Sequence, residues 1–196
     1  MSRIFDISPR LRPGRPAWPG DAPTTLHWTN RIADGDRANV GALSCSTHAG
    51  AHVDAPLHVV AEAGDVNSLP LDAFWGPARV FETGAGAVGA TALSALDWQG
   101  VERALFRTGG EGYLTEEAAA FLIERRVKLV GIDTLSVDPE GHPDMPVHRA
   151  FARAGIAILE CLRLDHAAAG DYELVALPLA IEGADASPVR AALRSF

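Results

Sequence analysis

Residues 45–58, with the sequence CSTHAGAHVDAPLH, hold three of the chain's seven histidines and one carboxylate. His48, His52, Asp54 and His58 fall within this short stretch, together with glycine and proline. On a helix, the spacing of four between His48 and His52 would place both imidazoles on one face, as in zinc-binding H-E-x-x-H sites. Whether this stretch is helical therefore decides how its side chains can be used.

Glycine and proline argue against a helix in this stretch. Gly50 weakens a helix, and Pro56 moves the preceding residue out of the α region. We therefore expect a turn or a short irregular loop at a strand end, which can direct the imidazoles and the carboxylate inward together. Such a set suits zinc, or manganese where more of the ligands are oxygens. The alternative is a group of solvated loop histidines, each with its own hydrogen bond.

Length and composition are typical of one globular domain that covers residues 1–196. The chain is 47% hydrophobic and 21% charged, with a formal net charge of -8. This acidic balance, without a basic block, argues against nucleic acid or an anionic membrane surface as the main partner. The N-terminus lacks the apolar region of a secretory signal, and no apolar run approaches the roughly 18 residues of a membrane span. We therefore expect a cytoplasmic protein.

The two cysteines, Cys45 and Cys161, are too few for a disulfide scaffold. We expect two small buried side chains in preference to a disulfide between them.

The pattern along the chain predicts a strand-rich N-terminal third followed by alternating helices and strands. Residues 1–40 are rich in proline, glycine and Asp/Asn, with short apolar pieces at 3–8 and 25–30 that favour strands or extended arms. We predict further strands at 40–46, 76–84, 103–108, 127–133, 156–160 and 171–181, and helices at 91–98, 115–126 and 145–155.

Two other candidate motifs are weak. Residues 83–90, TGAGAVGA, formally match G-x-G-x-x-G after a strand. A dinucleotide site would need an acidic residue at the end of the next strand, but that strand ends at Thr108, so we interpret the stretch as a glycine-rich connection. Ser44 and Ser46 lack the flanking glycines of a nucleophile elbow, which disfavours a serine hydrolase.

The stretch HAGAHVDAPLH resembles the H-x-G-T-H-x-D-x-P-x-H signature of the cyclase-type metal-dependent hydrolases, whose best-known members are bacterial kynurenine formamidases. The resemblance continues in family order through residues 16–21, 130–139, 146–160 and 171–195, so it covers nearly the whole chain. It implies an α/β domain of the swivelling β/β/α type that forms homodimers or higher homo-oligomers.

Carried over position by position, the resemblance implies a site for two divalent metal ions, zinc in the first place and manganese as the alternative. The implied ligands are His48, His52, Asp54, His148 and Glu160. Asp54 and Glu160 would bridge the two ions. His58 would be the general acid/base, and Trp18 an aromatic wall against the substrate.

The chain departs from the family pattern at three places. Position 51 is alanine where the signature has threonine, and Cys161 stands where kynurenine formamidases usually carry glycine. The segment between residues 108 and 115 is also shorter than in typical members, and substrate-contacting residues lie there in the family. This last departure bears on the substrate more than on the type of reaction.

The resemblance implies an enzyme that acts on a small aromatic amide. The main hypothesis is an arylformamidase that hydrolyses N-formyl-L-kynurenine to L-kynurenine and formate in tryptophan degradation. A metal-activated hydroxide would attack the formyl carbon, and His58 would protonate the departing arylamine. One alternative is hydrolysis of a cyclic amide such as isatin, or of another small amide or lactone. A non-catalytic metal-binding module is the other, although a structural site would not need His58.

Overall fold

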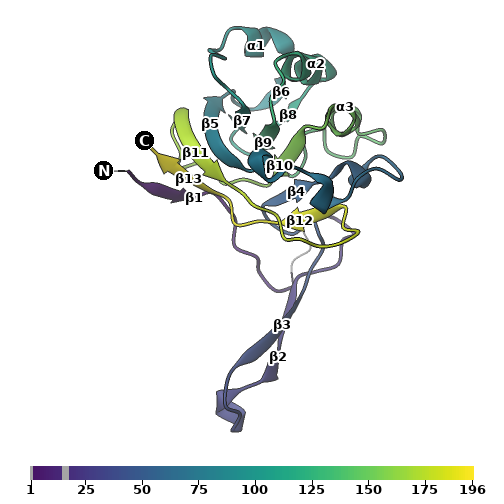
Figure 1. The fold of residues 1–196 in the computed structure, drawn as a ribbon, viewed down its shortest axis with the longest axis vertical. Helices are drawn as coiled ribbons and strands as arrows, with labels where there is room; N and C mark the ends of the chain where they lie inside the picture. The colour runs from purple at the N-terminus through teal and green to yellow at the C-terminus, as the bar shows by residue number, and fades with distance from the viewer. Residues whose placement is uncertain (1, 15–17) are drawn as a thin grey trace.

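A curled nine-stranded mixed sheet forms the body of the molecule in the computed structural model, which describes residues 2–14 and 18–196 (Figure 1). Its strands follow the order β1-β13-β11-β5-β7-β9-β10-β4-β12. β5, β7, β9 and β10 are parallel, and antiparallel strands extend the sheet at both sides. The bounds are β1 Ile4–Asp6, β4 His52–Asp54, β5 Trp75–Glu82, β7 Arg103–Arg107, β9 Leu129–Ile132, β10 Ala157–Glu160, β11 Gly170–Val175, β12 Ala186–Pro188 and β13 Ala192–Ser195.

In the described part of the chain, three helices cover one face of the parallel strands, toward the top of Figure 1. They are α1 (Ala90–Ser94), α2 (Glu116–Glu124) and α3 (Pro146–Ala154). Ala104 and Phe106 of β7 pack toward these helices, while Leu105 between them faces the other side of the sheet. Both faces of the parallel strands are therefore buried, which explains their continuous apolar sequences.

The apolar side chains between the helices and the sheet form one hydrophobic core, and a second core lies inside the curl of the sheet. Leu105, Leu129 and Leu159 of the parallel strands share it with Val53 of β4 and Leu193 of β13. Since β4 and β13 belong to opposite sides of the sheet, the sheet must curl to bring their side chains into one cluster. Within this curled sheet β4 pairs with β10, where the candidate site lies.

Two small ribbons complete the structure. β2 (Thr25–Asn30) and β3 (Val40–Ser44) form an antiparallel arm that projects from the body, with a short 3₁₀ turn, Ile32–Asp34, at its tip (Figure 1). β6 (Gly86–Val88) and β8 (Gly112–Leu114) pair in parallel beside the helices. Further 3₁₀ turns span Pro56–His58, Val66–Ser68 and Leu71–Ala73.

The predicted α/β class is confirmed, and the differences lie at element ends and in the short strands β4, β6, β8, β12 and β13, which the sequence pattern does not predict. Thr115 caps α2 by accepting from Ala118 N at 3.2 Å, as its sequence indicates. The strand predicted at 171–181 ends at Val175, because its partner β5 begins at Trp75 and offers no ladder beyond that residue. The helix predicted at 91–98 is only the short α1. Among the described residues, no helix is long and apolar enough to cross a membrane.

Candidate metal centre and catalytic cavity

Strands β4 and β10 place polar side chains on one face of the sheet. Val53 and Leu159 point into the inner core, so the alternation of a strand turns their neighbours His52, Asp54 and Glu160 to the opposite face, toward α3. His52 lies directly opposite Glu160 in the register. The irregular loop expected for this part of the sequence is wrong for residues 52–54, because β4 pairs with both β10 and β12.

Helix α3 brings His148 over this face, and Asp138 fixes its orientation. The Asp138 carboxylate accepts from the backbone N–H groups of Val147 at 2.9 Å and His148 at 3.0 Å, in the first turn of the helix. It also accepts from His148 Nδ1 at 2.6 Å. Nδ1 therefore carries the proton, and Nε2 is left 3.4 Å from Asp54 Oδ2 and 3.2 Å from Glu160 Oε1.

His52 is oriented in the same way from the opposite side. Its Nδ1 donates to the backbone oxygen of Gly50 at 2.9 Å. Its Nε2 then lies 3.4 Å from Asp54 Oδ1 and 3.5 Å from Glu160 Oε2. Each carboxylate thus has one oxygen near His52 Nε2 and the other near the nitrogen of His148.

A further carboxylate, Asp185, connects the two remaining histidines of the motif. Its Oδ2 accepts from His48 Nε2 at 3.0 Å and from His58 Nδ1 at 3.4 Å, and its Oδ1 accepts from Thr47 Oγ1 at 2.9 Å. His48 Nδ1 is consequently directed at Asp54 Oδ1, 3.0 Å away. The rings of His48 and His58 lie 4.3 Å apart between centroids.

The centre of this cluster is rich in negative charge and has few hydrogen-bond donors: the backbone N–H of Val137 donates to Glu160 Oε1 at 2.7 Å. Asp54 and Glu160 are 4% and 3% exposed. Both Asp54 oxygens and His52 Nε2 have no hydrogen-bond partner within the described part of the chain. Burial opposes the ionisation of Asp54, yet the surrounding imidazoles, His52 foremost, hold the pKa of its carboxyl well below its usual range. Buried charges of this kind are stable when they are paired or bind a metal, so the donor set fits a divalent cation.

A cavity of about 220 Å³ opens onto these side chains. Its wall includes Trp18, His48, His52, His58, His148 and Glu160, while Asp54 lies buried behind them. All of the site residues predicted from the sequence are thus brought together at one place.

Trp18 reaches the cavity through a turn. The backbone N–H of Asp21 donates to the Trp18 carbonyl oxygen at 3.0 Å, and Asp21 Oδ2 accepts from Ser46 Oγ at 2.7 Å. The turn is thereby joined to the segment that carries the histidines. The tryptophan and the imidazoles consequently belong to one wall.

The two cysteines are free, as expected, but the expectation of two buried side chains is wrong. Cys45 and Cys161 are both half-buried, and Cys161 lines the cavity. The backbone of Cys161 is left-handed, with φ 59°. Glycine adopts this conformation without strain, whereas a residue with a side chain does not. Cys161, which stands where kynurenine formamidases usually carry glycine, therefore occupies a position whose backbone favours glycine.

Sequence reasoning did not single out Asp138 and Asp185. Both lie in segments that carry the family resemblance, 130–139 and 171–195, and this is the signal that pointed to their neighbourhood. Asp138 contacts residues nine and ten positions further along the chain, whereas the partners of Asp185 lie more than 120 positions away and are revealed only by the tertiary contacts.

Comparison with known proteins agrees with this geometry. The family model named Cyclase matches residues 5–139, more than half of the chain. This chain belongs to the cyclase family. A kynurenine formamidase of Delftia acidovorans is 41% identical over 211 residues, covering 99% of this chain and 98% of the relative. The family resemblance inferred from the histidine motif is therefore confirmed.

Solved structures of cyclase-family hydrolases share the fold along the full chain. One, described as a potential metal-dependent hydrolase with cyclase activity, has a TM-score of 0.87 and 26% identity, covering 100% of this chain and 99% of that one. Isatin hydrolase A from Labrenzia aggregata has a TM-score of 0.84 and 25% identity, covering 98% and 93% of the two chains. This cyclase-family chain is a hydrolase.

Proposed function

We propose that this hydrolase converts N-formyl-L-kynurenine to L-kynurenine and formate, a step of tryptophan degradation. The convergence of three oriented imidazoles on the buried carboxylates of Asp54 and Glu160, inside a cavity walled by Trp18, carries the proposal. The full-length similarity to a kynurenine formamidase supports the choice of substrate. Cytoplasmic location stays a prediction.

The same cluster supports a site for two divalent ions, with zinc as the expected metal. His48 and His52 would hold one ion and His148 the other, while Asp54 and Glu160 would serve both, since each has one oxygen on either side. In such sites a divalent metal lowers the pKa of bound water toward neutrality and polarises a carbonyl oxygen. Imidazole and carboxylate ligands together match the preferences of zinc.

His58 is suited to move protons within the cavity. Its Nδ1–H is held by Asp185 at 3.4 Å, which leaves the other ring nitrogen free to exchange a proton. Burial lowers the pKa of the His58 imidazole, so the neutral form, which can accept a proton, is favoured near neutral pH. His58 would then accept a proton from the attacking water and deliver it to the nitrogen of the departing arylamine. Trp18 would pack against the aromatic ring of the substrate.

Isatin hydrolysis is the second candidate. The likeness to isatin hydrolase A along nearly the whole of both chains favours it. Isatin also contains an amide nitrogen on an aromatic ring, so the same acid/base and the same aromatic wall would serve both reactions. The two substrates differ in whether the amide is open or part of a ring.

The deciding experiment compares formate release from N-formyl-L-kynurenine with ring opening of isatin, on protein loaded with Zn²⁺ or Mn²⁺. A higher kcat/KM for the formamide supports the proposal, and a clear preference for isatin would replace it with the second candidate. Protein that binds neither metal and hydrolyses neither substrate would refute metal-dependent hydrolysis at this site.

Two variants separate the proposed roles. His58→Ala should keep metal and fold while kcat falls by about 10²- to 10⁴-fold, the scale of general acid–base catalysis. Asp54→Asn should lose metal and turnover together. His166→Ala, outside the cavity, is the control and should keep full activity. Metal loss in His58→Ala would instead identify His58 as a ligand.

A further inference from the structure

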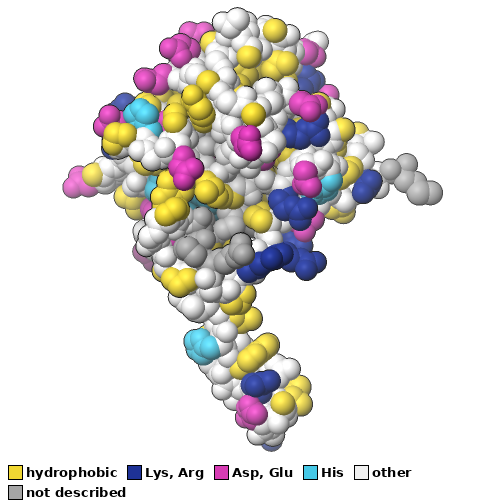
Figure 2. Space-filling model, turned by 180° about the vertical axis from the view of Figure 1, so that it is seen from behind, with side chains coloured by type: hydrophobic (Ala, Val, Ile, Leu, Met, Phe, Trp, Pro, Cys, Tyr) yellow, Lys and Arg dark blue, Asp and Glu magenta, His cyan; other side chains and the backbone are white. Residues whose placement is uncertain are grey.

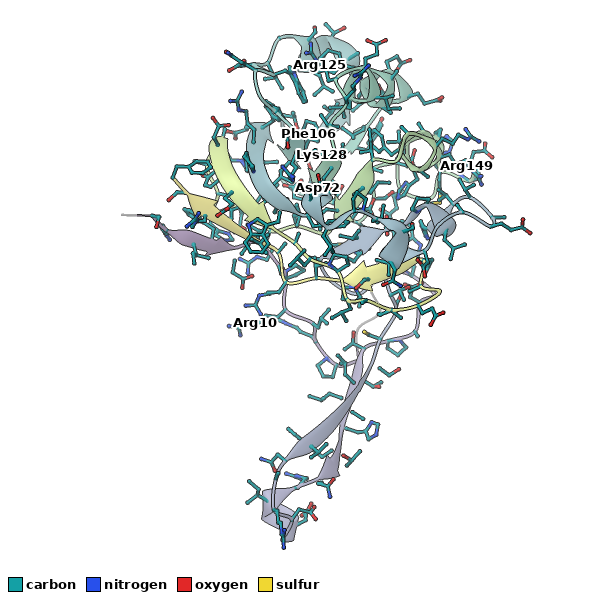
Figure 3. The ribbon with its side chains drawn as sticks, in the orientation of Figure 1. Arg10, Asp72, Phe106, Arg125, Lys128 and Arg149 are labelled. Carbon is teal, nitrogen blue, oxygen red and sulfur yellow. The ribbon has the colours of Figure 1, made fainter. Side chains whose placement is uncertain are left out.

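A groove lined by arginines opens directly beside the catalytic cavity. It measures about 700 Å³, and Arg10, Arg12 and Arg163 belong to its wall. Leu135 and Cys161 line both the groove and the cavity, so the two spaces are contiguous. Basic side chains gather where the β2–β3 arm leaves the body in the space-filling view (Figure 2), and Arg10 lies beside the base of the arm (Figure 3). A ligand held in the cavity can therefore extend into a positively charged groove.

The segment that carries Arg10 and Arg12 is packed against the loop of the candidate site. Leu11, between the two arginines, lies on Gly50, where an added Cβ would be 2.6 Å from Leu11 Cδ2. Gly50 also supplies the backbone oxygen that accepts from His52 Nδ1 at 2.9 Å. The same loop thus orients His52 and supports the segment with the arginines, which fixes the groove relative to the candidate site.

Arg163 reaches the groove from the sheet. It follows shortly after Glu160, the last residue of β10. Its backbone N–H donates to the oxygen of Ile7 at 2.8 Å, so the exit of β10 is joined to the N-terminal segment. Two separate parts of the chain, both tied to the candidate site, therefore bring their arginines to one groove.

The protein itself balances little of the positive charge in this groove. No aspartate or glutamate is among the described residues of its wall. Within residues 2–14 and 18–196, neither Arg10 nor Arg12 takes part in an ion pair, and both are exposed. Arg163 Nη2 lies 3.6 Å from Oδ2 of Asp165, an exposed carboxylate. The groove consequently offers guanidinium groups to an anion, in a chain whose formal net charge is -8.

The substrate under the proposed function carries an anionic group away from the bond that is cut. In N-formyl-L-kynurenine, the ketone side chain beside the formamide ends in an amino acid with a free carboxylate. The cavity measures about 220 Å³, below the roughly 300–1,000 Å³ of typical small-molecule sites. With the formamide among the imidazoles, the amino-acid end therefore extends beyond the cavity. Guanidinium groups bind carboxylates through charge-assisted and often bidentate hydrogen bonds.

We propose that Arg10, Arg12 and Arg163 bind the carboxylate at the amino-acid end of the substrate, while its aromatic formamide end occupies the cavity. This inference rests on the proposed function. The groove then selects formamides that carry an acid group over simple aryl amides. Because the carboxylate takes no part in bond breaking, the arginines contribute to substrate binding, and their loss raises KM while kcat stays nearly unchanged.

The first test compares two aryl formamides on zinc-loaded protein. N-formyl-L-kynurenine carries the carboxylate, whereas 2-formamidoacetophenone has the same ring, ketone and formamide without the amino-acid end. The variants Arg10→Ala/Arg12→Ala and Arg163→Ala should each lower kcat/KM for the first substrate by about 10- to 100-fold through KM, the scale of a lost charge-assisted hydrogen bond. For the second substrate, kcat/KM should change by less than about twofold, because the arginines do not touch it.

The matched control, Arg125→Ala/Arg153→Ala, removes the same charge elsewhere. Both arginines are exposed, at the ends of α2 and α3, and Arg125 lies at the far end of the molecule from the groove (Figure 3). The control should keep both activities. Equal losses on the two substrates, a loss in the control as large as in the groove variants, or no loss in the groove variants would overturn the inference and leave the formamidase activity standing. Wild-type protein that hydrolyses neither formamide would instead overturn the proposed function.

The second test measures binding without turnover. L-kynurenine keeps the carboxylate, and 2-aminoacetophenone is the matched ligand that lacks it. In isothermal titration calorimetry, wild-type protein should bind L-kynurenine at least about 10-fold more tightly than 2-aminoacetophenone, and Arg10→Ala/Arg12→Ala should remove most of this difference. Equal affinity of the wild-type protein for the two ligands would refute a carboxylate site in the groove, whether or not the formamide is hydrolysed.

Discussion

Replacement of Asp138 by asparagine tests a carboxylate of the site that accepts three hydrogen bonds, without removing a proposed metal ligand. Asp138 is 2% exposed and accepts hydrogen bonds from Val147 N, His148 N and His148 Nδ1. An asparagine of nearly the same shape keeps one acceptor oxygen and puts an NH₂ group in place of the other. At least one N–H group of α3 or of the imidazole then faces a donor.

The expected cost follows from these contacts. A buried donor left without a partner costs about 1–3 kcal/mol. Loss of the negative charge at the N-terminus of α3 adds about 0.3–1 kcal/mol. We therefore expect Asp138→Asn to lower the free energy of unfolding by about 1–4 kcal/mol in metal-free protein. Because the orientation of His148 is also loosened, zinc affinity should fall by about 10- to 100-fold.

Urea unfolding of metal-free protein and zinc competition with a chromophoric chelator measure these two effects separately. Asp165→Asn is the control, because Asp165 is an exposed carboxylate whose contacts are with Arg163 and His166 at the surface. Its unfolding free energy should change by less than about 0.5 kcal/mol. An Asp138→Asn protein as stable as this control, with unchanged zinc affinity, would refute the role assigned to Asp138.

Three further substitutions probe the cavity and the core. Asp185→Asn should lower kcat by about 10- to 100-fold at saturating metal, because His58 loses its orienting acceptor, and steady-state kinetics with metal analysis would check it. Gly131→Ala should cost about 1–3 kcal/mol in urea unfolding, since its Cβ would clash with Cδ2 of the fully buried Leu105; a neutral effect would show that this core relaxes. Trp18→Ala should weaken substrate binding by about 1–2 kcal/mol, seen as a higher KM, and unchanged kinetics would place Trp18 outside the substrate contact.

The local sequence determined much about this protein. Thr115 and Gly155 mark the ends of α2 and α3, because capping depends on residues within one helical turn. The composition of the 48–58 stretch identified the histidines and the aspartate of the site, because imidazole and carboxylate are the donors that metals select. The alternation of helices and strands likewise follows from the apolar periodicity along the chain.

Tertiary structure alone decided how these groups are used. His52 and Asp54 form a strand because β10 and β12, more than one hundred residues away in sequence, pair with them on both sides. Asp185 meets His58 across 127 positions of the chain, so no local pattern reveals the contact. Hydrogen bonds of this kind depend on the curl of the sheet and the docking of α3, which arise from packing of the whole chain. The residue types were readable from the sequence, whereas their orientation and the projection of the arm came only from the folded molecule.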